Sequence, residues 1–336
     1  MITDIVLGLQ HGDEGKGKVT HHLLKNGEYT HCVRFNGGCN AGHTIFHNGK
    51  KFVTHHIPAG VFFGVTSVIG SGCVIDPKKL QDEIDYLESH GIPVREHLRI
   101  AKNAHVITEE HKAEDSTDET IGTTRTGNGP AYRDKYGRTG VRAGDVPALQ
   151  PFLVDIYEEL SGHTIILMEG AQGFWLDPDW GDYPYVTSSH TGVAAAIQNG
   201  INPRSLRNVW GVIKAYETYV GKRQFQPDEE VFDRIQEVGQ EFGATTGRVR
   251  QCNWINVDEV RQAIHMNGVN RLVVNKMDVL REIGIWGTTK GRIHGERHFR
   301  DHLNSEFGPT RGVDKVYFSD NVENIYEQNH LTTAAK

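Results

Sequence analysis

A glycine- and lysine-rich turn near the start of the chain has the residue types and spacing of a phosphate-binding loop. Residues 8–20 read GLQHGDEGKGKVT and overlap the end of an apolar stretch, Ile5–Leu9, that predicts a strand. Gly12, Gly17 and Lys18 satisfy the G-x-x-x-x-G-K spacing. Glycines let backbone N–H groups approach phosphate oxygens, and the start of the following helix adds a positive end. The turn therefore predicts a nucleoside phosphate site.

The residue after the loop lysine departs from the usual phosphate loop. Val19 stands where a Walker loop places the Ser or Thr that binds magnesium. A magnesium ion must then find another oxygen ligand, and the carboxylate of Asp13, inside the loop, is the candidate. Lys16 and Lys18 can supply positive charge to phosphate oxygens.

A second group of polar residues follows another apolar stretch. Residues 271–278 read RLVVNKMD, so the predicted strand delivers Asn275, Lys276 and Asp278 at its carboxyl end. A carboxylate there can accept hydrogen bonds from N1–H and N2–H₂ of guanine, two donors that adenine does not offer in that arrangement. Because an unpaired carboxylate facing the wrong base is costly, this site would discriminate strongly. Together the two motifs predict GTP as the nucleotide.

The composition narrows the class of protein. The chain has 336 residues, 37% of them hydrophobic, and a net charge of −7, which does not favour nucleic-acid backbone or an anionic membrane. The four cysteines are scattered with no CxxC pair, which suits a reducing cytosol rather than a zinc knuckle or a disulfide framework. The first ten residues lack a basic segment and read as a strand rather than a signal peptide. We expect a cytoplasmic protein that binds neither nucleic acid nor membrane.

Apolar β-branched stretches alternate with amphipathic ones, which predicts an α/β fold: a largely parallel central sheet with helices on both faces and small helical and hairpin insertions. The expected strands are Ile5–Leu9, Cys32–Phe35, Thr66–Ile69, Thr164–Met168 and Leu272–Val274, and the expected helices are Lys18–Lys25 and Pro77–His90. Thr44–His56 is expected to form a hairpin around Asn48-Gly49.

Two segments do not follow these patterns. Residues 121–142 are rich in Gly, Thr and Arg, and residues 176–190 are rich in Asp, Gly, Tyr and Ser. Long ordered loops inside a compact chain are usually functional, so we expect both to contribute to the site. With no repeat and no evident linker, residues 1–336 are interpreted as one domain.

At this point the chain resembles the adenylosuccinate synthetase family over most of its length. The family's diagnostic QWGDEGKGK loop is QHGDEGKGK here. Its other motifs follow in the family's order: NGGCNAGHT (36–44), IGTTRTGNGPAYRDK (121–135), EGAQG (169–173), YPYVTSS (183–189), GATTGRVR (243–250) and NKMD (275–278). The resemblance implies the family's fold, a parallel-centred α/β sheet with helical insertions, and a homodimer.

The resemblance also implies a reaction. A 6-oxopurine is a poor electrophile at C6, so its N1 proton is removed and O6 attacks the γ-phosphate of GTP. The amine of L-aspartate then displaces the phosphate from the 6-phosphoryl intermediate. By resemblance, Asp13 is the N1 base and a magnesium ligand, and His43 is the acid that stabilises charge on the β–γ bridge. Lys16 would hold the transferring phosphoryl group, Gln172 would complete the catalytic group, and the Gly42 carbonyl would be a second magnesium ligand.

The remaining site residues carry over by position in the matching motifs. The GTP site would comprise Gly12, Glu14, Gly15, Lys16, Gly17, Lys18, Gly42, His43, Thr44, Asn275, Lys276, Asp278, Gly308 and Pro309. The acceptor nucleotide would contact Asp13, Asn40, Thr123, Thr124, Gln172, Thr187 and Arg248, with Arg138 reaching across from the partner of the homodimer. L-Aspartate would be bound by Thr245, Thr246, Arg248 and Arg250. Arginine suits a carboxylate because its planar fork pairs both oxygens.

Several departures from the family's pattern bear on the acceptor. Little sequence separates GDV (144–146) from EGAQG, a trimming that resembles archaeal members and the phage relatives that make 2-aminoadenylosuccinate from dGMP on the route to diaminopurine DNA. GKRQFQPDEE (221–230) replaces the segment that the family usually has at this place, and His11 replaces the family's usual Trp. FGPT (307–310) again resembles the phage relatives. Those phage enzymes typically lose the loop aspartate and the guanine motif, whereas Asp13 and NKMD remain here. We therefore expect a GTP user with (d)GMP as the favoured acceptor and IMP as the alternative.

Two other classes of protein fit the sequence less well. A regulatory GTPase needs Ser or Thr at the position of Val19 and a DxxG motif after a strand, but the one evident DxxG, Asp134–Gly137, lies in a polar segment. An inactive binding relative is disfavoured because the residues proposed for acid, base, phosphoryl contact and metal are all present.

Overall fold

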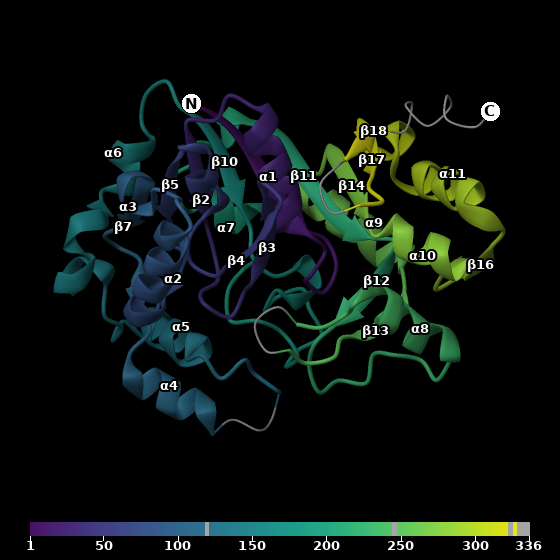
Figure 1. The fold of residues 1–336 in the computed structure, drawn as a ribbon, viewed down its shortest axis with the longest axis horizontal. Coiled ribbons are helices and arrows are strands. Elements are labelled where there is room, and N and C mark those ends of the chain that lie inside the picture. The colour runs from purple at the N-terminus through teal and green to yellow at the C-terminus, as the bar shows by residue number, and fades with distance from the viewer. Residues whose placement is uncertain (118–120, 244–246, 322–324, 328–336) are drawn as a thin grey trace.

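A ten-stranded sheet organises the chain in the computed structural model, which describes residues 1–117, 121–243, 247–321 and 325–327 (Figure 1). The strand order is β18-β17-β14-β11-β1-β10-β2-β5-β7-β9. All neighbouring strands are parallel except β17 and β18, which are antiparallel. The bounds are β1 (Ile2–Gly8), β2 (His31–Arg34), β5 (Thr66–Ile69), β7 (Leu98–Ala101), β9 (Leu153–Val154), β10 (Ile165–Glu169), β11 (Leu206–Lys214), β14 (Arg271–Asn275), β17 (Lys315–Phe318) and β18 (Tyr326–Glu327). The predicted α/β class is confirmed.

Smaller elements surround this sheet. In the described part of the chain, two-stranded sheets pair β3 (His43–His47) with β4 (Lys50–Thr54), β6 (Val74–Ile75) with β8 (His105–Val106), β12 (Tyr216–Tyr219) with β13 (Gln251–Trp254), and β15 (Trp286–Thr288) with β16 (Gly291–Ile293). The α-helices are α1 (Lys16–Asn26), α2 (Pro77–Ser89), α3 (Val94–His97), α4 (Glu109–Ser116), α5 (Asn128–Gly137), α6 (Ile156–Leu160), α7 (Val193–Ile197), α8 (Glu230–Gly239), α9 (Val257–Asn267), α10 (Met277–Ile283) and α11 (Gly295–Phe307). No helix among the described residues is long and apolar enough to cross a membrane.

Local sequence explains several of these elements. Asp76 caps α2, because its carboxylate accepts the backbone N–H groups of Lys78 and Lys79 at 3.1 and 3.2 Å. The β3–β4 hairpin turns at Asn48 and Gly49, whose φ angles of 50° and 73° are those a type I′ turn requires. The helix predicted over Pro77–His90 and the hairpin predicted around Asn48-Gly49 are confirmed. The interpretation of the chain as one domain stays a prediction.

The segment 121–142 differs from the expected loop, because its middle part forms α5 beside α4 (Figure 1). Helix propensity there is low, with glycines at both ends and Pro130 in the first turn, where no N–H donor is needed. Burial of Ala131 and Tyr132 offsets that low propensity, and the Tyr132 hydroxyl donates to the Gly72 carbonyl at 2.8 Å. Residues 177–190 contain neither helix nor strand, as expected.

The strand order places the chemistry at one edge of the sheet. β14, β11, β1, β10 and β2 are consecutive neighbours, and all five are parallel. Their carboxyl ends therefore lie side by side, which is where ligands bind in open α/β sheets. The phosphate loop follows β1, and NKMD begins at the last residue of β14.

Candidate active site

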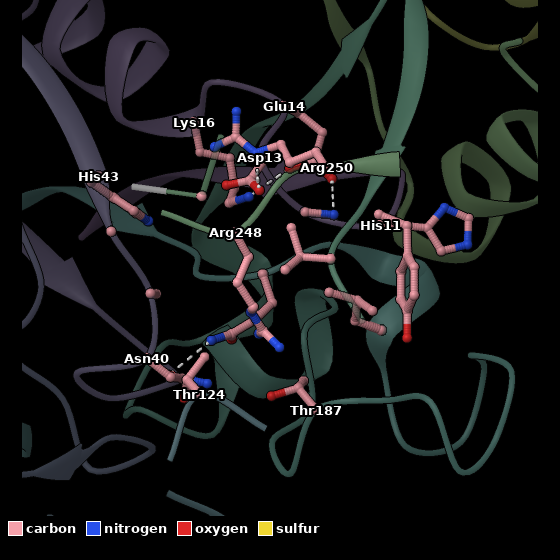
Figure 2. A pocket seen from close by; sticks show the side chains of 18 of the residues that line it. His11, Asp13, Glu14, Lys16, Asn40, His43, Thr124, Thr187, Arg248 and Arg250 are labelled. Carbon is pink, nitrogen blue, oxygen red and sulfur yellow. Dashed lines mark hydrogen bonds and ion pairs between the residues drawn. The ribbon is translucent and has the colours of Figure 1, made fainter. Parts of the chain in front are cut away.

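A cavity of about 980 Å³ opens at the carboxyl ends of these strands. Most of the predicted site residues line it: Gly12, Asp13, Glu14, Gly15, Lys16, Gly17, Lys18, Asn40, Gly42, His43, Thr44, Thr123, Thr124, Gln172, Thr187, Arg248, Arg250, Asn275, Lys276 and Asp278. Figure 2 shows Asp13, Glu14 and Lys16 gathered at one end and Asn40, Thr124 and Thr187 at the other. The volume accommodates ligands of nucleotide size.

The other predicted residues lie elsewhere. Arg138 does not line the cavity; it is exposed and ends α5 in a left-handed conformation. Gly308 and Pro309, just beyond α11, also do not line it. Thr245 and Thr246 lie outside the described residues. The roles proposed for these five residues stay predictions.

The phosphate loop is held in shape by a buried carboxylate. Glu14 Oε1 accepts the backbone N–H groups of Gln10 and Gly12 at 3.2 and 2.9 Å, and its Oε2 accepts Lys16 Nζ at 2.6 Å. The loop turns through positive φ angles at Gly12 (90°) and Gly15 (91°). A Cβ at Gly15 would stand only 2.8 Å from Asn275 Nδ2, so glycine is required there on two grounds.

The two loop lysines have different partners. Lys16 is buried against Glu14, whereas Lys18 donates to the Ser319 hydroxyl and the Asn321 carbonyl. Burial lowers the pKa of Lys18 to about 8. Asn275 joins the guanine motif to the loop, because its Nδ2 donates to the Glu14 carbonyl at 2.7 Å. Asp278, in contrast, is exposed at the cavity wall, where a base could reach it.

His43 belongs to a buried charged cluster with two residues that sequence reasoning missed. Its Nδ1 forms a short hydrogen bond with Glu169 Oε1, and the same oxygen accepts Arg34 Nη2 at 2.9 Å. Burial, with the nearby Arg34, lowers the pKa of His43 to about 4, although Glu169 acts in the opposite direction. The imidazole is therefore neutral at pH 7, with Nδ1–H on Glu169 and a lone pair on Nε2. Nε2 must therefore gain a proton before His43 can donate a hydrogen bond to a phosphate oxygen through this atom.

Other histidines share this burial, and acid is expected to unfold the protein. Burial lowers the pKa values of His21 and His105 to about 4 and that of His56 to about 3. Below pH 6.5 the unfolded chain protonates these imidazoles while the folded chain does not, so stability falls as the pH drops towards 4. We expect a loss of about 2–4 kcal/mol between pH 7 and 5, measured by urea unfolding. Equal midpoints at the two pH values would contradict this.

A second charged cluster surrounds Asp13. Arg250 Nε donates to Asp13 Oδ2 at 2.7 Å, and Arg250 Nη1 donates to Glu241 Oε2 at 2.6 Å. Lys214 Nζ lies 3.2 Å from Glu241 Oε1. Burial alone would raise the pKa of Glu241, but Lys214 and Arg250 lower it to about 2. Arg250, predicted to bind aspartate, is thus shared between two carboxylates.

The residues missed from the sequence share one signal. Arg34, Glu169 and Lys214 each end a largely buried strand, β2, β10 and β11 respectively. Burying a charge at the end of an apolar strand costs free energy unless the charge is paired. A charged residue at such a position therefore indicates that another segment supplies an oppositely charged partner. The sequence pattern thus predicts that a partner exists, but it does not identify the partner residue.

The far end of the cavity is built from amides and hydroxyls. Gln172 Nε2 donates to Asn40 Oδ1 at 3.2 Å, and buried Asn36 donates to Gln172 Oε1 at 3.3 Å. Arg248 Nη1 donates to the Gly122 carbonyl at 2.8 Å. These neutral donors and acceptors suit the polar edges of a base and sugar, with Arg248 as the cation nearby (Figure 2).

The donors beside the phosphate loop fit magnesium. Mg²⁺ prefers oxygen ligands, usually one or two protein oxygens with water and phosphate completing the octahedron. The Asp13 side chain is about one-third exposed, and both Asp13 and Gly42 line the cavity. A carboxylate and a backbone carbonyl are therefore available next to the phosphate site, and Arg250 would share the carboxylate.

A glycine-rich loop at a helix start, an exposed carboxylate at the cavity wall and a polar end of amides and hydroxyls are features of a nucleotide-dependent enzyme of the α/β class. The adenylosuccinate synthetase family model matches this chain over residues 5–163 and 147–285. The adenylosuccinate synthetase of Endomicrobium trichonymphae is 36% identical over 98% of this chain and 86% of its own length. That of Phocaeicola vulgatus is 39% identical over 83% of this chain and 78% of its own. The chain belongs to the adenylosuccinate synthetase family.

Solved structures agree with this assignment. The fully ligated adenylosuccinate synthetase of Plasmodium falciparum superposes with a TM-score of 0.83 at 27% identity, covering 96% of this chain and 98% of that one. The succinoaminodeoxyadenylate synthetase of cyanophage S-2L, bound to dGMP and dATP, gives 0.77 at 24% identity over 97% and 95%, which shows a shared fold. The protein is thus an enzyme of the GTP-dependent carbon–nitrogen ligase type, with GTP and Mg²⁺ as its cofactors.

Proposed function

We propose that this protein joins L-aspartate to C6 of IMP, with GTP converted to GDP and phosphate. The observation that carries the proposal is that one cavity is lined by the phosphate loop, by NKMD and by the polar end at Asn40 and Gln172. GTP and a purine monophosphate can therefore meet at the loop, where Asp13 and His43 both line the wall. The overall reaction converts IMP, aspartate and GTP to adenylosuccinate, GDP and phosphate.

The proposed roles follow from the positions of these groups. Asp13 would take the N1 proton of the base, which makes O6 nucleophilic towards the γ-phosphate of GTP. Lys16 and protonated His43 would stabilise charge on the phosphoryl group and on the β–γ bridge. Magnesium, held by Asp13 and the Gly42 carbonyl, supplies charge neutralisation when bound. Arg248 and Arg250 would hold the aspartate carboxylates.

The choice of IMP reverses the preference for (d)GMP. That preference came from the phage-like features of the sequence, chiefly the short segment between GDV (144–146) and EGAQG (169–173). The curated relatives at 36–40% identity are adenylosuccinate synthetases, and adenylosuccinate is the product made from IMP. The phage enzyme that binds dGMP is more distant, at 24% identity, and is bound to dATP as energy donor. This chain keeps Asn275 and Asp278 at the cavity wall, which supports GTP as donor.

The acceptor is tested by measuring aspartate- and GTP-dependent turnover with IMP and dGMP in the same assay. We expect kcat/KM for IMP to exceed that for dGMP by at least about tenfold, because a pocket selective for IMP would leave the 2-amino group of dGMP unpaired. A preference for dGMP would restore the phage-like alternative. Turnover of GTP without aspartate and a monophosphate would instead indicate a regulatory GTPase.

The guanine contact has its own test. Asp278→Asn replaces one acceptor oxygen by an NH₂ group, which opposes the N1–H and N2–H₂ donors of guanine. We expect the ratio of kcat/KM for GTP over ATP to fall by about 100-fold, since a carboxylate bond to such donors is worth roughly 2–3 kcal/mol. Glu282→Asn, at an exposed position late in the same helix, serves as a control. An unchanged ratio in Asp278→Asn would show that guanine is recognised elsewhere.

We also propose a homodimer in which Arg138 contacts the nucleotide of its partner. Its exposure at the end of α5, away from the cavity of its own chain, is compatible with that role. The cytoplasmic location stays a prediction.

A further inference from the structure

Three metal-ligating side chains from distant parts of the sequence meet next to the phosphate loop. His11 precedes Gly12 of the loop, Glu217 lies on β12, and Glu259 lies in the first turn of α9. One ligand atom from each, a ring nitrogen or a carboxylate oxygen, lies within 4.8 Å of the other two. His11 Nδ1 is 3.3 Å from Glu217 Oε2. The fold, rather than a local motif, brings them together.

The histidine of this group has an unused polar atom. His11 is 8% exposed and Glu217 is 2% exposed. Although His11 Nδ1 is close to Glu217, it makes no hydrogen bond within the described residues. A buried polar atom without a partner is costly, which points to a ligand on that nitrogen.

The group joins two carboxylates to one imidazole. Glu217 Oε1 accepts the backbone N–H of Asn256 at 3.1 Å. The guanidinium of Arg223 donates to Asp182 Oδ2 at 2.8 Å. A bound cation would offset the negative charge of the carboxylates.

We propose that His11, Glu217 and Glu259 bind one divalent transition-metal ion of the zinc class. An imidazole nitrogen with carboxylate oxygens suits such an ion, whereas Mg²⁺ prefers oxygen ligands alone. Metal–ligand bonds of about 2.0–2.2 Å place ligands roughly 3.4 Å apart, which small side-chain rotations would reach from the present separations. Aromatic rings orient the imidazole: Phe225 lies edge-on at 5.0 Å.

This site is separate from the proposed magnesium position. Figure 2 shows the His11 ring well away from Asp13 and Lys16. Because His11 is covalently next to Gly12, an ion here would tie the start of the phosphate loop to β12 and α9. Metal binding by the free protein does not depend on which nucleotide is the acceptor.

The test uses the whole protein, stripped with a chelator and free of nucleotide. It is equilibrated with Zn²⁺ in buffer containing excess Mg²⁺, and bound zinc per chain is measured by elemental analysis. We expect one zinc per chain. His11→Phe keeps the ring packing, and Glu259→Gln keeps the shape of a half-buried side chain. Each variant should weaken zinc binding by at least about tenfold, because losing a metal ligand costs more affinity than losing a residue that only hydrogen-bonds to a ligand.

A matched control comes from another cluster, Asp177, Asp179 and His190, whose ligand atoms also lie within 4.8 Å of one another. His190→Ala should leave the zinc content unchanged. Absence of stoichiometric zinc, full affinity in Glu259→Gln with a native circular dichroism spectrum, or loss of zinc in His190→Ala would each overturn the proposal. A thiolate-to-metal band on substitution with Co²⁺ would also overturn it, because it would place the ion on a cysteine.

Discussion

Replacing Asp13 with Asn is expected to lower turnover by at least about 10³-fold while leaving the fold intact. Asparagine has nearly the same shape and tolerates the left-handed conformation of this position, where φ is 61°. It carries no negative charge, however, so it can neither remove the N1 proton of the base nor neutralise a magnesium ion. The expected loss thus comes from the chemistry and not from the conformation of the loop.

The measurement is the initial rate of aspartate-dependent GDP release with saturating IMP and GTP, alongside thermal unfolding. Because Arg250 keeps Glu241 as a partner and Asp13 is partly exposed, we expect a stability loss below about 1 kcal/mol. Asp85→Asn is the matched control, since Asp85 is an exposed carboxylate 2.8 Å from Arg95 and is not among the residues that line the cavity. A near-normal rate in Asp13→Asn would remove this residue from the mechanism.

Replacing Glu169 with Gln is expected to cost the largest amount of stability, about 3–5 kcal/mol. Glu169 is fully buried and pairs with Arg34, whose Nε and Nη1 have no hydrogen-bond partner within the described residues. Glutamine would leave that guanidinium buried without a counter-charge. It would also remove the carboxylate that favours the protonated form of His43, so turnover should fall as well.

Urea unfolding of the variant and wild type measures this cost. Glu88→Gln, which breaks the exposed pair with Arg95, should lose less than about 1 kcal/mol. The double variant Arg34→Met/Glu169→Leu should be more stable than Glu169→Gln, because no charge is then left unpaired. A loss below about 1 kcal/mol in Glu169→Gln would show that Arg34 is compensated by another group.

Much of the fold could be predicted because its signals are local. A run of apolar residues such as Thr66–Ile69 predicts a strand wherever it occurs, and this strand has the predicted bounds. Asp76 caps the helix that follows it by bonding to N–H groups two and three residues ahead. The helix α5 was not predicted, since its residues are poor helix formers and only packing against α4 and neighbouring segments compensates.

In the candidate site, too, some residues could be predicted from the sequence and others could not. Asp13, Lys16, His43 and Asp278 could be named from the sequence because their motifs place them at fixed offsets within a loop or after a strand. Their partners could not. Lys16 was expected to be available to phosphate, but it also pairs with Glu14, and Arg250 is shared by Asp13 and Glu241. The preference for (d)GMP rested on the length of the segment before EGAQG and on phage-like motifs. These features do not identify the residue that faces C2 of the base.

By itself, the sequence determined which segments become central strands, where the phosphate loop lies and which residue types are available for the chemistry. Only the tertiary structure decided which charges neutralise one another: Arg34 with Glu169 and Lys214 with Glu241, and the meeting of His11 with Glu217 and Glu259. Backbone preferences act over a few neighbouring residues, so they can be read locally. The pairing of buried charges depends on which strands are neighbours and where their ends lie, and that is set by the packing of the whole sheet.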